Sequence, residues 1–214
     1  VSGDYSNYEF GSQNGVNMVI PNVMLQVVDK PLDVTIKSVE ALDFKEKVYV
    51  SPDNTVTINA PSININNGWI NAIDNAGGKI VLNGAVNVYT AAKGLVADTV
   101  VKTEAQDQLN RAGVIDINES VNITSYGEAV VANGGTININ QGGKFDTRYG
   151  DYPDALTVTS DAIVAMEKVV TPYGDASEAE LYQGVVNIKG DADNRINIQS
   201  NSNALYSEGG IINI

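Results

Sequence analysis

A short motif, a small residue followed by two apolar residues in alternation with polar ones, recurs six times along this 214-residue chain. Its clearest copy, 134–140, reads GGTININ, with Ile137 and Ile139 separated by polar residues. Alternation with a period of two is typical of a β-strand with one buried face. The other copies begin at Asn54, Gly78, Gly113, Gly184 and Gly210.

Two further apolar blocks accompany the motif. The first stands shortly before each copy, at 41–44, 72–75, 94–97, 129–132, 162–165 and 204–207. In most copies another block stands upstream of that one, at 62–65, 85–88, 120–123, 155–158 and 195–198. The repeating unit is therefore a strand, a turn, a short apolar segment, a glycine turn and a final strand.

The spacing of the unit predicts how it folds. The residues before the final strands lie 24, 35, 22, 49 and 26 positions apart (Asn54, Gly78, Gly113, Gly135, Gly184 and Gly210). The short intervals hold three short strands with their turns, at roughly 3.3 Å per strand residue, and the long ones indicate insertions. One such circuit cannot bury its apolar face alone, so neighbours must stack. The sequence predicts an all-β solenoid, a parallel β-helix of about six coils.

The domain organisation follows from where the repeat begins. Residues 1–31 do not fit the unit, and we interpret them as an N-terminal cap or first strands, with a separate binding site as the alternative. Residues 32–214 are predicted to form one continuous domain. Because the chain begins at Val1 and stops at Ile214 within a strand block, we expect it to be a piece of a longer secreted protein, truncated at its C-terminal end.

The insertions are predicted to gather at one edge. Those of coils three and five follow the equivalent residues Ala97 and Ala165, so they should leave the same edge two coils apart, roughly 10 Å from one another. Within the first, 103–111 carries a capping signal for a short helix. Smaller deviations are a modest insertion at 45–52 in coil one and a loop at 141–154 that leaves another corner.

Composition excludes several classes of function. The formal net charge is −13, and such an acidic chain is not expected to bind nucleic acid, which needs clustered Lys and Arg. Cys is absent, which excludes disulfides and thiolate metal sites. The turn at 191–194 resembles the start of a calcium loop, but Ser202 stands where the bidentate Glu would be. We therefore expect no metal and no cofactor.

Asparagine recurs at equivalent outward positions. One set follows the final strands and is expected to form hydrogen-bonded ladders along the axis (Asn59, Asn83, Asn118 and Asn140). A second set lies within the strands (Asn138, Asn187 and Asn213). With Thr57 and Asp116, this second set is predicted to make a polar face suited to self-association with a like face.

The GG-x-I-x-I-N and S-V-N-I-T coils, together with the acidic composition free of Cys, resemble passenger domains of bacterial autotransporter adhesins, within the pectin-lyase-like right-handed β-helix group. The resemblance covers about 33–214. It implies a right-handed, single-stranded parallel β-helix displayed at the outer surface of a diderm bacterium. The translocator barrel of such proteins would lie in a missing part of the chain. The partner would be a host, matrix or bacterial surface protein or glycan, or another copy.

The edge loops supply the candidate contact residues. Tyrosine offers a large contact area with a polar tip at low entropic cost, and it is common in these loops. The predicted binding residues are Tyr149, Asp151, Tyr152, Tyr173, Asp175 and Tyr182. Trp69, in a turn of coil two, is either a platform for stacking on sugars or a side chain packed over a coil edge.

An enzyme is the alternative class, because the same fold carries polysaccharide lyases and hydrolases. Those reactions need paired carboxylates, or calcium with a basic residue. Candidates are Asp146, Arg148, Asp151 and Asp154 in one loop, and Asp175, Glu178 and Glu180 in another. No catalytic spacing is recognisable and His is absent, so no catalytic residue is assigned. A spacer stalk without a binding role also remains open.

Overall fold

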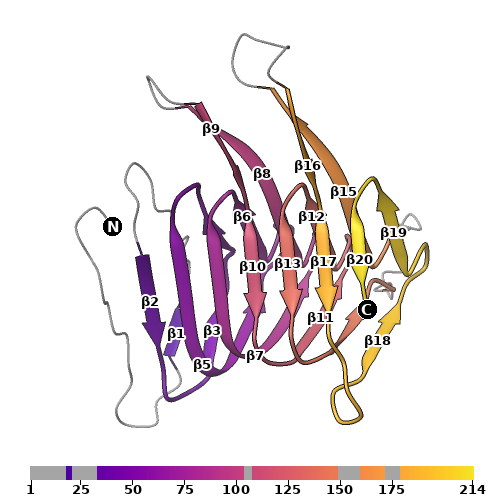
Figure 1. Cartoon of the computed structure of the whole chain (residues 1–214). Coiled ribbons are helices and arrows are strands. Elements are labelled where there is room, and N and C mark those ends of the chain that lie inside the picture. Colours follow the sequence, from indigo (N-terminus) through magenta and orange to yellow (C-terminus); the bar gives the residue numbers. More distant parts are fainter. Residues whose placement is uncertain (1–17, 21–32, 104–107, 149–159, 172–178) are drawn as a thin grey trace.

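The computed structural model describes residues 18–20, 33–103, 108–148, 160–171 and 179–214, and only the backbone for 18–20, 101–103 and 108–110. Every regular element in this part of the chain is a β-strand, so it contains no helix that could span a membrane. Except in two hairpins, the strands pair in parallel, and they curl around one core (Figure 1).

The parallel strands form three rows that run along the axis of the molecule. Row I holds β2 (Asp33–Lys37), the first parts of β5 (Thr55–Asn66) and β7 (Lys79–Thr90), β10 (Val114–Ile117), β13 (Thr136–Ile139), β17 (Val185–Ile188) and β20 (Ile211–Asn213). Row II holds β1 (Met18–Ile20), β3 (Leu42–Phe44), the second parts of β5 and β7, β11 (Val121–Ser125), β14 (Gly143–Asp146) and β18 (Ile196–Gln199). Row III holds β4 (Val48–Val50), β6 (Ile73–Ala76), β8 (Leu95–Thr103), β12 (Val130–Asn133), β15 (Ile163–Val170) and β19 (Leu205–Glu208).

The described chain passes through rows I, II and III in order six times, and β20 begins another circuit. Equivalent residues of successive circuits pair in register, so that Ile115, Ile137 and Val186 lie side by side in row I. This confirms the all-β, parallel, stacked arrangement of a solenoid-like fold.

The alternation of apolar and polar residues along each strand explains which side chains form the core. In β13 the side chains of Ile137 and Ile139 are fully buried, whereas Thr136 and Asn138 on the other face are only half-buried. Because the register places apolar residues directly against their equivalents, each coil continues the core of the previous one. The motif 134–140 is therefore sufficient to predict both the strand and its buried face.

Two assignments of strands from sequence were wrong. The block 41–44 contributes β3, which pairs with Ile63–Ile65 in row II, and β4 in row III comes from 48–50, so 45–52 is not an insertion. In coil five, the row II strand is β14 and not 155–158, which lies outside the described residues. Here Gly143 packs against Val121 and only Phe145 is large and buried, so the apolar alternation was not visible.

The two long insertions form β-hairpins. In the first, β9 (Gln108–Ala112) pairs antiparallel with the outer half of β8, with Thr103 opposite Gln108, so the predicted helix at 103–111 is wrong. The outer half of β8 supplies hydrogen-bond partners for the backbone of β9, whereas an isolated helix this short has only marginal stability in water. In the second hairpin, β16 (Glu180–Gln183) pairs with β15. Both project from the corner between rows III and I, two coils apart, as predicted (Figure 1).

Tight turns alternate with these hairpins at the same corner. Coils two, four and six turn through Gly77, Gly134 and Gly209, whose φ angles of 87°, 74° and 70° favour glycine. A Cβ atom on Gly134 would lie 2.8 Å from Thr99 Oγ1 of the first hairpin and 3.0 Å from Lys168 Cβ of the second. The turn of coil four therefore has no room for a side chain between the two hairpins.

The N-terminal region is described only in part. Met18–Ile20 pairs in parallel with Leu42–Phe44 and so extends row II by one strand. The remainder of 1–32 lies outside the described residues, and the division into a cap at 1–31 and a solenoid at 32–214 stays a prediction.

Candidate binding face

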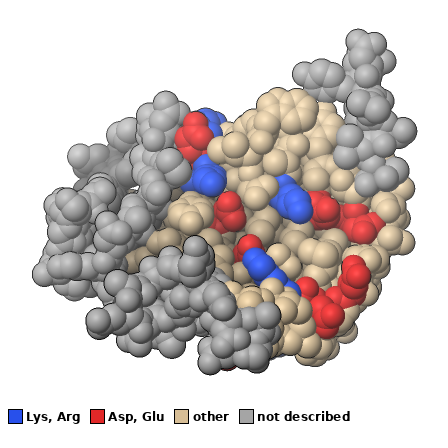
Figure 2. Space-filling model, turned by 90° about the horizontal axis from the view of Figure 1, so that it is seen from above, with Lys and Arg blue, Asp and Glu red and all other residues tan. Residues whose placement is uncertain are grey.

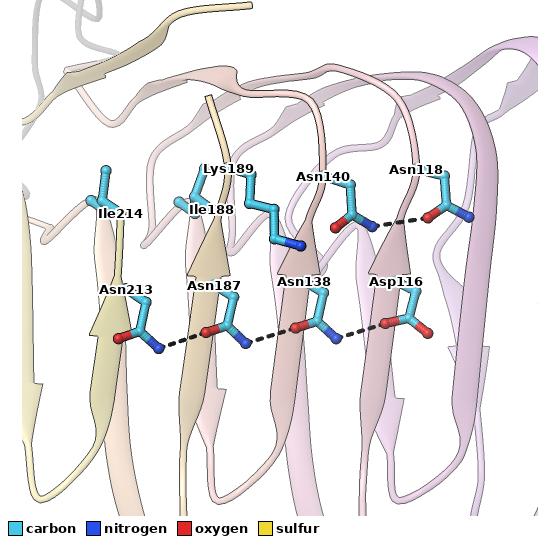
Figure 3. Close-up of a pocket in the computed structure, with 9 residues that line it drawn as sticks. All are labelled: Asp116, Asn118, Asn138, Asn140, Asn187, Ile188, Lys189, Asn213 and Ile214. Atoms are coloured by element: carbon cyan, nitrogen blue, oxygen red, sulfur yellow. Dashed lines mark hydrogen bonds between the residues drawn. The ribbon is translucent and has the colours of Figure 1, made fainter. Parts of the chain in front are cut away.

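A chain of hydrogen-bonded side chains crosses the outer surface of row I. The Asn213 Nδ2 group donates to Asn187 Oδ1 (2.6 Å), Asn187 Nδ2 donates to Asn138 Oδ1 (2.8 Å), and Asn138 Nδ2 donates to Asp116 Oδ1 (2.7 Å) (Figure 3). We call this chain ladder 1. The structure thus brings together all three residues predicted for self-association, on neighbouring strands and in register.

Two more ladders run parallel to the first. Ladder 2 follows the corner between rows I and II through Asn59, Asn83, Asn118 and Asn140, with bonds of 2.6 to 2.9 Å. The predicted hydrogen bonds along the axis are therefore confirmed. Ladder 3 lies on row II and links Asp43, Asn64, Asn87 and Asn122 at 2.8 to 3.2 Å.

The ladders have a common direction, since in every bond the Asn of the later coil donates to the residue of the coil before it. Asp116 accepts at the start of ladder 1 and Asp43 at the start of ladder 3. An ionised carboxylate can only accept hydrogen bonds. An Asp at the N-terminal end of a ladder therefore requires the next Asn to donate to it, and the following Asn residues donate in the same direction. Lys79 Nζ lies 3.4 Å from the second Asp116 oxygen and balances its charge.

Ladders 1 and 2 border a groove on this surface, which we call the amide face. The groove has a volume of about 520 Å³, and Ile188, Lys189 and Ile214 complete its lining. Lys189 follows β17, in the place where the preceding coils carry the Asn residues of ladder 2, and its side chain extends toward β13 (Figure 3). The groove therefore presents a regular array of amides beside one positive charge and an apolar end.

The structure describes only one of the six predicted contact residues. Tyr182 lies on β16, half-buried, and its hydroxyl donates to Glu180 Oε2 at 2.6 Å. The other five lie outside the described residues: Tyr149, Asp151, Tyr152, Tyr173 and Asp175. Their role stays a prediction.

The structure describes three of the candidates for acid–base chemistry, Asp146, Arg148 and Glu180. Each of them makes a hydrogen bond to a neighbouring side chain. Asp146 on β14 accepts a hydrogen bond from Arg148 Nε at 3.2 Å, and this bond lowers the pKa of the Asp146 carboxyl from its ordinary value. The Arg148 guanidinium also donates to Gln199 Oε1. Glu180 lies on β16 in the second hairpin, and Asp151, Asp154, Asp175 and Glu178 are outside the described part.

The corner that bears the hairpins is held by paired charges. Lys168 Nζ of β15 lies 2.6 Å from Asp98 Oδ1 of β8, and Asn133 Nδ2 of the coil between them donates to the same oxygen at 3.0 Å. In coil one, Asp53 takes the positive φ of 61° and pairs with Arg111 of β9 at 2.5 Å. Figure 2 looks onto this corner and shows acidic and basic side chains next to one another.

In the turn that resembles a calcium loop, the Asp191 carboxylate accepts hydrogen bonds from the backbone of the turn itself. Asp191 Oδ1 accepts the backbone N–H of Asn194 (2.7 Å) and of Asp193 (2.9 Å), and these bonds lower the Asp191 pKa. Among the residues that the structure describes, no three His, Cys, Asp or Glu side chains gather in a group that could hold a metal ion.

Sequence reasoning missed two parts of the amide face and its surroundings. Ladder 3 was not predicted, although the blocks SININ, AVNV and SVNIT all carry Asn at the same outward position. Lys189 was also missed, because nothing local distinguishes it from any other exposed lysine. Only alignment of the coils shows that it replaces an Asn of ladder 2.

Ladder 1 provides a direct test of how much these bonds stabilise the fold. Asn187→Ala removes one donor and one acceptor and should lower the free energy of unfolding by about 0.5–1.5 kcal/mol, since the half-buried partner Asn138 regains water only in part. Asn213→Ala, which loses one described bond at an exposed position, should cost less. Urea unfolding measures both variants, and equal losses would contradict a contribution from the continuous ladder.

Comparisons with known proteins identify no relative of this chain. No protein-family model, no curated protein and no solved structure matches it. Its function must therefore be inferred from the geometry of the amide face and of the surfaces beside it.

Proposed function

We propose that this chain is part of a surface-displayed bacterial adhesin, folded as a right-handed, single-stranded parallel β-helix of the autotransporter passenger type. It attaches the cell to a host, matrix or bacterial surface, or to another copy of itself, through the amide face and the edge hairpins. The single observation that carries this proposal is ladder 1, which lines up three amides and a carboxylate on an outer surface.

The chemistry of the amide face suits attachment. Each interior Asn of ladders 1 and 2 uses one of its two N–H donors and one of its two acceptor sites within the ladder, so both kinds remain for a partner. The spacing of parallel strands repeats these groups at roughly 4.8 Å. A surface with equal numbers of donors and acceptors at a fixed interval is complementary to a like surface, and this favours self-association.

Sedimentation and cell-clumping assays test the proposal. The double variants Asn138→Asp with Asn187→Asp, and Asn138→Lys with Asn187→Lys, place like charges opposite one another and should weaken self-association at least about tenfold. Asn122→Asp, at the exposed end of ladder 3, is the matched control and should leave it unchanged. Urea unfolding of each variant separates loss of contact from loss of fold.

The same preparations should be applied to arrays of host glycans and matrix proteins, with product analysis on the glycans. Specific binding without turnover supports the adhesin. Shortened or unsaturated product would contradict it in favour of a polysaccharide-degrading enzyme. A monomer that binds nothing and does not cause clumping would contradict it in favour of a spacer stalk.

A further inference from the structure

An exposed Trp69 ring lies against the half-buried ring of Tyr126 at the corner between rows II and III, away from the amide face. Trp69 is 79% exposed, and its ring lies nearly parallel to that of Tyr126, with 8° between the planes and 6.0 Å between the centroids. At this centroid separation, parallel rings are stacked with a sideways displacement and lie in different planes. Trp69 thus packs over the coil edge through its contact with Tyr126, but most of its side chain stays exposed.

The register of the coils explains how the two rings meet. Ala91 N donates to Gly68 O, and Tyr126 N donates to Thr90 O, so Trp69, Ala91 and Tyr126 occupy the same place in coils two, three and four. Trp69 and Tyr126 are thus two coils apart, roughly 10 Å along the axis. The small side chain of Ala91 leaves space over which the rings approach one another.

Buried Thr90 holds this arrangement in place. Its hydroxyl lies within hydrogen-bond distance of both carbonyls that flank Trp69, at 3.2 Å from Gly68 O and 2.8 Å from Ile70 O. Its own carbonyl accepts the N–H of Tyr126 at 3.2 Å. One residue therefore fixes the backbone beneath both rings, so a ligand that stacks on them finds the surface preorganised.

A polar row runs beside the rings. Asn71, Lys93 and Glu128 occupy the next equivalent place outward along the same corner, because Ala72 N donates to Lys93 O and Gly94 N donates to Glu128 O. Lys93 Nζ lies 3.3 Å from Glu128 Oε2, and both side chains are partly exposed. Amide, ammonium and carboxylate groups thus lie along the same corner as the stacked rings.

We propose that this corner, which we call the Trp69 platform, binds the sugar rings of an extended neutral glycan. The C–H face of a pyranose is apolar and flat enough to lie on an aromatic ring, while its hydroxyls extend sideways to donors and acceptors. The exposed ring of Trp69, held against the ring of Tyr126, offers the stacking position, and Asn71 with the Lys93–Glu128 pair offers hydroxyl partners. The site is separate from the amide face and stands whether or not that face mediates attachment.

Intrinsic fluorescence tests the proposal, because Trp69 is the only Trp in the chain. We expect titration with hexamers of β-1,4-linked glucose or N-acetylglucosamine to change the emission saturably for at least one of them. Calorimetry should then show an affinity at least about tenfold lower for Trp69→Ala and for Tyr126→Ala. Thr90→Val, which keeps the rings but loses the hydroxyl, should weaken binding with unchanged stoichiometry.

Controls keep these outcomes distinct. Tyr206→Phe, on β19, should bind as the native chain does, and the self-association of the Trp69→Ala variant should be unchanged. No saturable change with either hexamer, or equal binding by Trp69→Ala, would overturn the platform and leave the proposed adhesin untouched. An emission change that depends on protein concentration alone would also overturn it, by showing that the rings contact a second copy.

Discussion

Phe145→Ala is expected to lower the free energy of unfolding by about 3–5 kcal/mol, because it empties the largest fully buried side chain described in the core. Phe145 stands between Ile123 and Ile198 in row II, so the cavity would open in the middle of a column of apolar side chains. Urea unfolding followed by circular dichroism measures the change. Phe145→Leu keeps most of the volume and should cost less than about 1.5 kcal/mol.

The loss should also be localised. Each coil contacts mainly its neighbours, so hydrogen exchange should accelerate first in β11, β14 and β18 and later in the coils toward β2. Uniform acceleration along the axis would contradict nearest-neighbour stabilisation. A cost of less than about 1 kcal/mol would contradict the burial of this ring in a well-packed core.

Gly134→Ala should destabilise the fold by about 2–4 kcal/mol. The left-handed backbone at φ 74° costs a non-glycine residue about 1–2 kcal/mol. The added methyl would in addition lie within 3.1 Å of Thr99 Oγ1 and of the Cβ atoms of Lys168 and Tyr182, which cannot rotate away. Thermal and urea unfolding measure the combined effect.

Gly68→Ala is the matched control for this variant. A Cβ atom there meets nothing within 4 Å, so the change in stability should stay within about 0.5 kcal/mol. If Gly134→Ala were equally mild, the two hairpins would not be packed against the turn between them.

The fold could be predicted largely because its information is local and repeated. The strands around Ile80, Ile115, Ile137 and Val186 each carry the same alternation, and one reliable copy identifies the rest. Prediction was wrong where the alternation contained a single large residue, as at Phe145, or where the strand had only three residues, as in β4. The hairpin at β9 was missed because its stabilising partner, β8, is not visible in a local capping signal.

The candidate sites depend on contacts between residues that lie far apart in the sequence. Asn138, Asn187 and Asn213 were found because the repeat aligned them, and the hydrogen bonds of ladder 1 follow from that register. From the sequence, a platform for stacking on sugars was only one of two interpretations of Trp69. Its ring stacks on Tyr126, which lies two coils away, across the small side chain of Ala91, and only the register of the coils brings the two together.

Because glycine turns and hairpins alternate along the corner, the spacing between the hairpins equals the distance between two packed β-layers. Adjacent parallel strands lie about 4.8 Å apart, so every second coil repeats after roughly 10 Å, which is also the distance at which two β-layers pack face to face. The hairpins β8–β9 and β15–β16 recur at this interval, with Lys168 and Tyr182 facing the intervening Gly134. The pitch of the coil thus sets the spacing at which the two ribbons leave the same corner, and this spacing requires no adjustment of the core beneath them.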